Sequence, residues 1–375
     1  MSGAPRIAIA GAGIGGLTLA GLLAARGFAA TVYEQASAFE RVGTGIQMGP
    51  NAVRILRALG IETNLRTRSA TPRHWRNRDG ETGELLNELP LGQDAEQHFG
   101  APYLLLHRGD LHDALCSTVP AKHIQTGRQL IEAQNDEDQV RLLFADGSVE
   151  TADVLVAADG LRSCIRAQLF AQQPPVYTGR VAFRSVFSTD EIRDLNLDDN
   201  TKWWGKDRHI VIYYLNNRRD EIYFTTSVPD PDWTDESWSA MGEPDEVREA
   251  LQDFHPNVRN VLDACPQVHK WAIADRPPLT DWSVGRIVLL GDACHPMTPY
   301  MAQGAAQAME DAMILARSFE ALGFDDLEAV AGTYQRTREA RASEIQTLSH
   351  QNLWMRSPTD AEWLYGYDAA SAPLL

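Results

Sequence analysis

The sequence predicts an α/β protein into which a smaller mixed α+β domain is inserted. Three short apolar runs, at residues 7–10, 154–158 and 287–290, each lead through a glycine into a helical pattern, as in a parallel sheet covered by helices. Between the last two runs lie stretches of β character such as "HIVIYYL" and "EIYFTTSV". A chain of 375 residues is long enough to form two domains.

Composition narrows the range of partners. The chain carries 34 basic and 51 acidic side chains, a net charge of −17, so its long-range field repels nucleic acid and anionic membranes. A small anionic ligand is compatible with this charge where local positive charge captures it. The four cysteines lack the spacing of a metal site or disulfide framework, and no apolar run reaches the length of a membrane span. We therefore expect a cytoplasmic protein with reduced thiols and without metal, nucleic-acid or membrane partners.

The first element is "RIAIAGAGIGGLTLAGLLAARGFAATVYEQA", which combines a strand, a glycine turn, an apolar helix and a second strand ending at Glu34. Gly11 permits the tight turn, Gly13 lets the backbone approach a pyrophosphate, and Gly16 lets the helix pack closely on the strand. Glu34 lies 18 residues after Gly16, where a carboxylate accepts hydrogen bonds from both hydroxyls of a ribose. The motif predicts a Rossmann-like site for FAD or a nicotinamide cofactor, with NADP the least favoured.

The second element, "DVLVAADGLRSCIR", is a strand that ends at Asp159 and Gly160 and opens a helix. The sequence allows two interpretations of this turn. Asp159 and Ser163 cap the helix, or the turn contacts a cofactor.

The third element, "GRIVLLGDACHP", delivers Gly291 and Asp292 to the carboxyl edge of the sheet, where open α/β sheets bind ligands. A helix follows from Gly304. Backbone donors near Gly304 and Ala305, together with the helix dipole, would stabilise negative charge placed there. His295, in the same stretch, favours a structural role over a catalytic one.

Taken in order, "GAGIGG" with Glu34, "HRGDL", "ADGLRSCIR" and "GDACHPMTPYMAQGAAQAMEDA" resemble the class A FAD-dependent aromatic monooxygenases, the para-hydroxybenzoate hydroxylase superfamily. The match spans almost the whole chain. It implies the para-hydroxybenzoate hydroxylase fold, in which a Rossmann-like FAD-binding domain contains an inserted substrate domain. The resemblance implies FAD contacts from the glycine turn and Glu34, and also from Arg41, Arg108, Asp159, Asp292, Pro299, Gly304 and Ala305. Among these, Arg108 would lie at the pyrophosphate, Asp292 at the ribityl chain, and Gly304 with Ala305 at the pyrimidine edge of the flavin.

The resemblance also implies the reaction, hydroxylation of an electron-rich ring carbon, with loss of a carboxylate where that carbon carries one. FAD would be the cofactor, O2 the oxygen source and NADH or NADPH a transient reductant, since the chain holds one GxGxxG motif. The stretches "GTGIQMGPNAVRIL", "KWWGKDRHIVIYY" and "WLYGYD" are most similar to 6-hydroxynicotinate 3-monooxygenases and less so to salicylate 1-monooxygenases. We expect a small hydroxylated N-heteroaromatic acid as substrate. The alternatives are a salicylate-like benzoic acid, or an oxidase or dehydrogenase that inserts no oxygen.

Four residues are candidates for the substrate site. His209 starts a strand and matches a pocket histidine of the resembling enzymes, so we expect it to accept the proton of the ring hydroxyl; the alternative is a solvent-facing strand end. Tyr213 shares its strand face and would hydrogen-bond the substrate, unless it is a packed cross-strand aromatic. Gln47 and Tyr300 should line the cavity, where the resembling 6-hydroxynicotinate enzymes have histidines. For Arg184 a surface ion pair is favoured over a carboxylate or flavin contact.

The predicted FAD-binding domain comprises residues 1–70, 100–178 and 277–350, and the substrate domain residues 71–99 and 179–276, whose sheet would roof the flavin. Residues 351–375 form a C-terminal tail. Its aromatic residues, Trp354, Trp363, Tyr365 and Tyr367, are explained by packing or by a dimer contact, and we expect a monomer or a homodimer.

Overall fold

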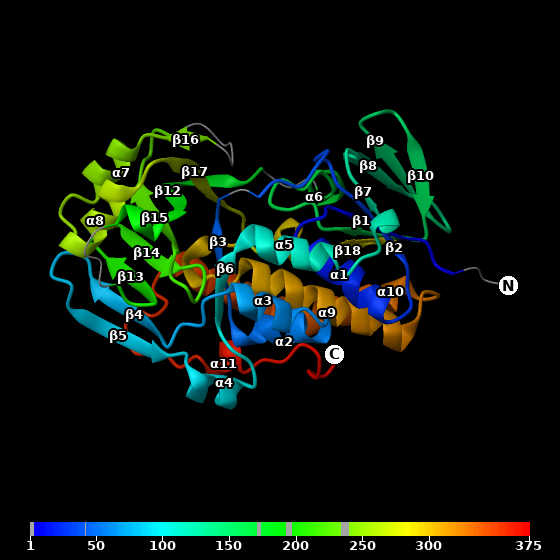
Figure 1. Cartoon of the computed structure of the whole chain (residues 1–375). Helices are drawn as coiled ribbons and strands as arrows, with labels where there is room; N and C mark the ends of the chain where they lie inside the picture. The colour runs from blue at the N-terminus through cyan, green and yellow to red at the C-terminus, as the bar shows by residue number, and fades with distance from the viewer. Residues whose placement is uncertain (1–3, 42, 171–173, 193–196, 234–239) are drawn as a thin grey trace.

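Two separate large sheets organise the two halves of the computed structural model (Figure 1). The structure describes residues 4–41, 43–170, 174–192, 197–233 and 240–375. One half holds a mainly parallel sheet with long helices beside it, and the other holds a larger, mainly antiparallel sheet. This arrangement confirms the predicted fold class.

The parallel sheet has the strand order β18-β19-β11-β1-β2-β7. Its strands are β1 (Ile7–Ala10), β2 (Ala30–Tyr33), β7 (Ile124–Gln125), β11 (Val154–Ala157), β18 (Ser283–Val284) and β19 (Ile287–Leu289). The first predicted strand coincides with β1, whereas β11 and β19 each end one residue earlier than predicted. All residues of β1 and β11 are buried, which explains why these strands are continuous apolar runs.

Three helices lie next to one another beside this sheet, namely α1 (Ile14–Ala25), α9 (Gly304–Leu322) and α10 (Leu327–Gln351) (Figure 1). Helix α1 packs between β1 and α9 and is apolar nearly all round, as expected for a helix without a solvent face. The other helices of this half are α2 (Pro50–Ala58), α3 (Glu62–Arg68), α5 (Arg108–Cys116) and α6 (Cys164–Phe170).

The larger sheet has the order β16-β17-β12-β15-β14-β13-β4-β5. Its strands are β4 (His74–Asp79), β5 (Leu85–Pro90), β12 (Val176–Ser188), β13 (Asn200–Trp204), β14 (His209–Tyr214), β15 (Glu221–Pro229), β16 (Met241–Gly242) and β17 (Val268–Asp275). The predicted runs "HIVIYYL" and "EIYFTTSV" are β14 and β15. All eight come from residues 74–90 and 176–275, while the domain boundaries themselves stay a prediction.

The two faces of the larger sheet have different neighbours. Trp203 stacks on His255, whose ring centre is 5.4 Å away at the start of α8 (Pro256–Ala264); α7 (Pro244–Ala250) precedes that helix. Because side chains alternate along a strand, Lys202 and Trp204 point to the opposite face, together with their neighbours on β14, His209 and Tyr213. This second face is the one that meets the other half of the molecule.

Smaller elements complete the fold. They are the three-stranded sheet of β8 (Leu130–Asn135), β9 (Val140–Phe144) and β10 (Val149–Ala152), the pair β3 (Gly45–Met48) and β6 (Leu104–His107), the helices α4 (Gln93–Phe99) and α11 (Glu362–Tyr365), and the 3-10 turns η1 (Ala121–His123), η2 (Thr189–Glu191), η3 (Gly291–Ala293) and η4 (Pro299–Met301). No motif in the sequence predicts the three-stranded sheet, since its strands are short and partly exposed.

The C-terminal tail packs onto the body of the chain. Tyr365 is fully buried, and its ring lies 5.8 Å from that of Tyr103 and 6.5 Å from that of Trp354. Packing within the chain therefore explains these two tail aromatics. Within the described residues, no helix combines the length and apolar character needed to cross a bilayer.

Candidate active site

A cavity of about 350 Å³ lies where the two halves meet. Its wall combines the glycine turn before α1, strand β3, the inner face of the larger sheet and the start of α9. Of the predicted site residues it includes Gly13, Gln47, Arg108, Tyr213, Asp292, Pro299, Gly304 and Ala305. Residues from all three sequence motifs and from the predicted substrate domain thus share one cavity.

The glycine turn leaves room only on its cavity side. Gly11 has φ of 101°, and a Cβ atom there would lie 2.4 Å from the carbonyl oxygen of Ala158. A Cβ on Gly16 would lie 2.1 Å from the carbonyl oxygen of Gly11. Gly13 has no atom within 4 Å of its Cβ position and lines the cavity, and no side chain caps the helix that begins after it. The first backbone N–H groups of α1 are therefore available to an anionic group.

Glu34 is held against this turn. Its Oε2 accepts a hydrogen bond from the backbone N–H of Ala12 at 2.8 Å, and its Oε1 accepts one from Ala36 at 2.9 Å. Arg41 pairs with Asp110 at 3.1 Å and is half exposed, whereas Arg108 lines the cavity. Glu34 and Arg41 are thus not part of the cavity wall, and Glu34 lies at the glycine turn, where a ribose is expected.

Asp159 lies behind the cavity rather than in it. Its neighbours Ala158 and Gly160 form part of the wall, while its own Oδ2 accepts a hydrogen bond from the N–H of Ile165 at 3.5 Å. Ser163 Oγ accepts one from Arg166 at 2.9 Å, which is the contact of a helix cap. Burial raises the pKa of the Asp159 carboxyl. Asp159 and Ser163 therefore both make the contacts that the capping interpretation predicts.

The third motif brings a carboxylate and a helix start to the same wall. Asp292 is exposed to the cavity, and desolvation by the surrounding protein atoms raises the pKa of its carboxyl against the opposing effect of His295 and Arg108. No side chain caps α9, so the backbone donors at Gly304 and Ala305 face the cavity unshielded. The preceding Ala302 adopts a left-handed conformation with φ of 54°, which turns the chain into this helix.

A buried ion network fixes α9 from behind. The Nε2 atom of His295 lies 2.5 Å from Asp311 Oδ2, and Arg338 on α10 donates to Asp311 at 2.8 Å and to Glu310 at 2.7 Å. Burial alone would raise the pKa of Asp311, but His295 and Arg338 outweigh it and lower that pKa to about 2. His295 thus lies among charges that hold two helices together.

Gln47 meets the cavity with a fixed orientation. Its Oε1 accepts hydrogen bonds from the Tyr103 hydroxyl at 2.7 Å and from the Asn200 amide at 3.3 Å. Both contacts occupy the oxygen, so the amide N–H2 is the end left for a ligand. Tyr213 lies beside it, with its hydroxyl 2.7 Å from the Cβ position of Gly45, a site where only glycine leaves room for that hydroxyl.

His209 and Tyr300 form a cluster next to the cavity wall. Their ring centres are 5.4 Å apart, and the Tyr300 hydroxyl lies 2.9 Å from Ser227 Oγ. His209 is buried, so it is not the solvent-facing strand end of the alternative interpretation. Burial, Lys202 and Arg180 lower the pKa of His209 well below its ordinary value, so the ring is neutral at neutral pH.

One expectation about the site is wrong, and three of its residues were not predicted. Arg184 is 3% exposed and lines the cavity, with its guanidinium 3.2 Å from the centre of the Trp271 ring, so the expected position at the protein surface is wrong. Asn200, Lys202 and Tyr103 were missed. Asn200 and Tyr103 belong to no motif, whereas Lys202 begins the stretch "KWWGKDRHIVIYY"; the strand alternation of "NTKWW" could have placed Asn200 and Lys202 on the face of the candidate residues.

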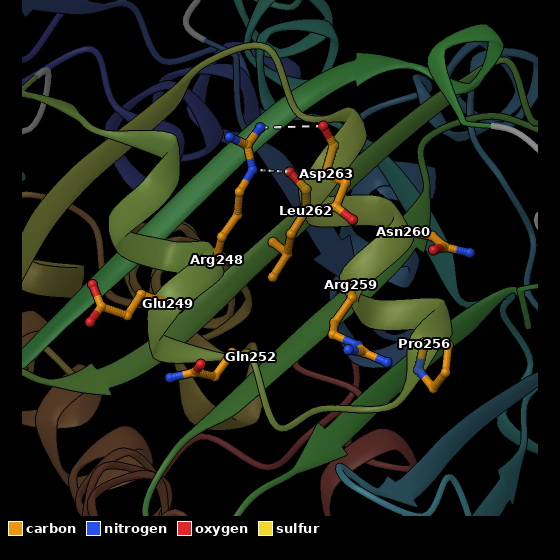
Figure 2. A pocket seen from close by; sticks show the side chains of 8 residues that line it. All are labelled: Arg248, Glu249, Gln252, Pro256, Arg259, Asn260, Leu262 and Asp263. Atoms are coloured by element: carbon orange, nitrogen blue, oxygen red, sulfur yellow. Dashed lines mark hydrogen bonds between the residues drawn. The ribbon is translucent and has the colours of Figure 1, made fainter.

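A second hollow, of about 580 Å³, lies between α7 and α8 on the outer side of the larger sheet (Figure 2). Arg248 donates there to the backbone carbonyls of Leu262 at 3.1 Å and Asp263 at 3.3 Å, which ties the two helices together. The hollow is open and lined mainly by charged and amide side chains, and its wall contains none of the candidate residues.

The cavity fits a flavin dinucleotide by its own geometry. Open space beside Gly13 and the uncapped start of α1 suit a pyrophosphate. The uncapped start of α9 suits an electron-rich ring edge, and Asp292, whose Oδ1 lies 3.9 Å from the Cβ position of Gly304, is an acceptor for hydroxyl groups in the same wall.

Comparison with known proteins agrees with this geometry. The family model of an FAD binding domain matches residues 5–349. The chain is 46% identical to a 6-hydroxynicotinate 3-monooxygenase of Bordetella bronchiseptica over 100% of this chain and 98% of the relative, and 43% identical to one of Pseudomonas fluorescens with the same coverage. A solved salicylate hydroxylase substrate complex superimposes with a TM-score of 0.82 at 26% identity, covering 98% of this chain and 96% of that one.

The chain therefore belongs to the FAD-binding family of class A flavin monooxygenases. It is an FAD-dependent monooxygenase of the aromatic hydroxylase type, a class whose typical reductant is NAD(P)H.

Proposed function

We propose that this enzyme hydroxylates a small hydroxylated N-heteroaromatic acid of the hydroxynicotinate type, with O2 and NADH or NADPH as co-substrates. The observation that carries the proposal is the single cavity in which the two uncapped helix starts face Gln47 and Tyr213. The similarity to 6-hydroxynicotinate 3-monooxygenases over the whole chain supports the substrate class. We further propose that the carboxylate leaves when it stands on the hydroxylated carbon.

FAD, when bound, would supply the activation of O2 and the transfer of one oxygen atom. The start of α9 would hold negative charge on the flavin through the N–H groups of Gly304 and Ala305 and its dipole. The inner face of the larger sheet would cover the reacting ring and exclude water. Gln47 and Tyr213 would orient the substrate through its polar groups.

The role of His209 depends on its neighbours. The Asn352 amide nitrogen lies 3.4 Å from His209 Nδ1, so the neutral ring carries its proton on Nε2. We propose that the neutral His209 ring takes the proton of the ring hydroxyl at Nδ1, in exchange for the hydrogen bond from Asn352, and releases the proton already carried on Nε2. Its buried position beside two cations disfavours a stored charge.

Because of Gln47 and Tyr300, a second class of aromatic acid remains a candidate substrate. The resemblance implies histidines at both positions in the hydroxynicotinate enzymes, and losing two imidazoles would change which substrate anion is favoured. A salicylate-like benzoic acid is the alternative, supported by the similarity to salicylate hydroxylase.

The test is aerobic NADH and NADPH consumption by the FAD-loaded enzyme with a panel of hydroxypyridine and hydroxybenzoic acids, with product masses recorded under 18O2. The proposal expects stimulation by a hydroxynicotinate and the gain of one labelled oxygen atom. A product without label would identify an oxidase or dehydrogenase, and stimulation by salicylate alone would select the second candidate. A cytoplasmic location and a monomeric or homodimeric state complete the proposal.

A further inference from the structure

A buried lysine lies on the inner face of the larger sheet. Lys202 on β13 is 1% exposed, and its Nζ lies 3.8 Å from the centre of the Trp204 ring and 5.9 Å from that of Tyr300. Its hydrogen bond goes to Asn352 Oδ1, at 3.1 Å, which is a neutral acceptor. Among the residues that the structure describes, no carboxylate lies within ion-pair distance of this ammonium group.

Two further cations surround the same place. The Arg356 guanidinium lies 5.5 Å from the centre of the Trp204 ring. Arg180 donates to Ser227 Oγ at 2.7 Å, the atom that also bonds the Tyr300 hydroxyl, and to backbone carbonyls. These acceptors are uncharged as well. Of the three cations only Lys202 is buried, and a buried ammonium group without a carboxylate partner in the described chain is costly unless an anion joins it.

This group adjoins the cavity. Tyr300 lies between Pro299 and Ala302, which both belong to the cavity wall. Ser227 lies two residues beyond Thr225 of that wall, on the same face of β15 and about 7 Å further along it. The cations therefore lie at the end of the site where the flavin-binding turns do not reach.

We propose that Lys202 is the counter-ion of the substrate carboxylate and so determines that the enzyme takes aromatic acids. This inference rests on the proposed function. Trp204 and Asn352 hold the ammonium group in place, and the arriving carboxylate supplies the missing negative charge. Gln47 and Tyr213, which line the cavity, are left for the remaining polar groups of the ring.

Two observations support the assignment. Burial and Arg356 lower the pKa of Lys202 well below its ordinary value, so an anion beside it is what would keep the ammonium charged. The chain as a whole carries a net charge of −17, yet this end of the site is locally positive, which is the condition for capturing a small anion.

The test compares Lys202→Met with Lys206→Met in the FAD-loaded enzyme. Lys206 is exposed in the turn that follows the same strand, so its loss removes the same charge away from the site. Dissociation constants are measured by the change in flavin absorbance without NADH, for 6-hydroxynicotinate and for 2-hydroxypyridine, which lacks the carboxylate. Salicylate and phenol form a second pair, and melting temperatures are recorded without ligand.

We expect Lys202→Met to weaken binding of the acid by about 30-fold or more, because a buried charge contact is lost. It should change binding of the carboxylate-free partner little, and the melting temperature without ligand should stay the same or rise, since a buried amine without an ionic partner in the described chain is replaced by an apolar side chain. Lys206→Met should show neither effect.

Equal weakening of acid and analogue, unchanged binding of both, or a lower melting temperature with loss of both ligands would overturn the inference. If the wild type binds salicylate but no hydroxynicotinate, the substrate proposal fails while the salicylate pair still decides the role of Lys202. A wild type that binds no aromatic acid overturns both.

Discussion

At the scale of single residues, the cavity wall presents neutral polar groups at Gln47 and Tyr213. The Oε1 atom of Gln47 is occupied by Tyr103 and Asn200, which leaves the amide as a donor. Burial raises the pKa of Tyr213 well above its ordinary value, so its hydroxyl stays protonated across the working range. A substrate oxyanion would therefore be held by hydrogen-bond donation rather than by paired charge at this end of the site.

This neutrality gives a prediction for Gln47→His. The variant places an imidazole, with an ordinary pKa of about 6.5, in a wall that now has none at this position. We expect the pH profile of kcat/KM to gain an ionisation near neutral pH and to fall by roughly tenfold on one side of it. The measurement is the pH dependence of kcat/KM with the best substrate of the panel.

Gln47→Asn is the control, since it keeps a neutral amide and should add no ionisation. A Gln47→His profile that superimposes on the wild-type one would remove Gln47 from the substrate end of the cavity.

The sequence identified single residues well where a motif surrounds them. Gly11, Gly13 and Gly16 have the backbone geometry that the motif requires, because a turn restricts its residues locally. Asn200 and Tyr103 could not be found in this way. They reach Gln47 across 153 and 56 residues of sequence, and only the pairing of strands brings them together.

At the scale of elements, the start of α1 combines open space with unpaired donors. Gly13→Ala adds one methyl group where the protein has room, and φ of −75° allows it. The methyl group would, however, occupy the approach of the pyrophosphate. We expect an unchanged melting temperature of the apoprotein and a dissociation constant for FAD raised roughly tenfold or more, about 1.4 kcal/mol.

FAD affinity is measured by titrating apoprotein and following flavin fluorescence. Gly92→Ala is a matched control, because Gly92 also precedes a helix, with φ of −72° and ordinary contacts at 3.6 Å. Equal FAD affinity in both variants would argue against a phosphate at α1.

The ion network between α9 and α10 gives a prediction with a pH dependence. A carboxylate whose pKa in the folded state is about 2 stabilises the protein above about pH 4, and this contribution is lost as the pH falls through about 2. Asp311→Asn should lower the free energy of unfolding at pH 7 by about 3 kcal/mol, since Arg338 loses a buried partner. The deficit should shrink between pH 4 and pH 2.

Urea unfolding of the FAD-loaded enzyme at pH 7 and pH 3 checks this. Asp245→Asn removes a carboxylate from an exposed pair with Arg248 and should change stability by less than about 0.5 kcal/mol. A deficit of equal size at both pH values would mean that the charge of Asp311 contributes nothing.

The ends of the strands that are continuous apolar runs were predicted to within one residue, as β1, β11 and β19 show. Burial on both faces gives such strands a strong signal. The strands β8 to β10 gave none, because their polar and apolar residues are mixed and their sheet is held by pairing with one another.

At the scale of the whole molecule, the tail connects parts that the sequence keeps apart. Arg341 on α10 donates to the carbonyls of Trp363 and Leu364, and Tyr365 packs on Tyr103. We expect Tyr365→Ala to cost about 3–5 kcal/mol, the usual cost of removing a buried aromatic ring. Chemical unfolding of the holoenzyme measures this cost.

Leu353→Ala is the control in the same tail. The Leu353 side chain is 54% exposed, so this variant should leave the free energy of unfolding nearly unchanged. Equal stability of the two variants would show that the tail does not support the body of the protein.

The contacts of Asn352 have a consequence for the biosynthesis of the enzyme. This residue touches His209 across 143 residues and Lys202 across 150, whereas the parallel sheet gains its last strand at Leu289 and α9 follows directly. A chain emerging from the ribosome therefore holds all strands of the parallel sheet, and α9, before it holds the residue that gives the face around His209 its contact from beyond α10. The sheet of the cofactor half is thus complete in the growing chain earlier than the substrate face.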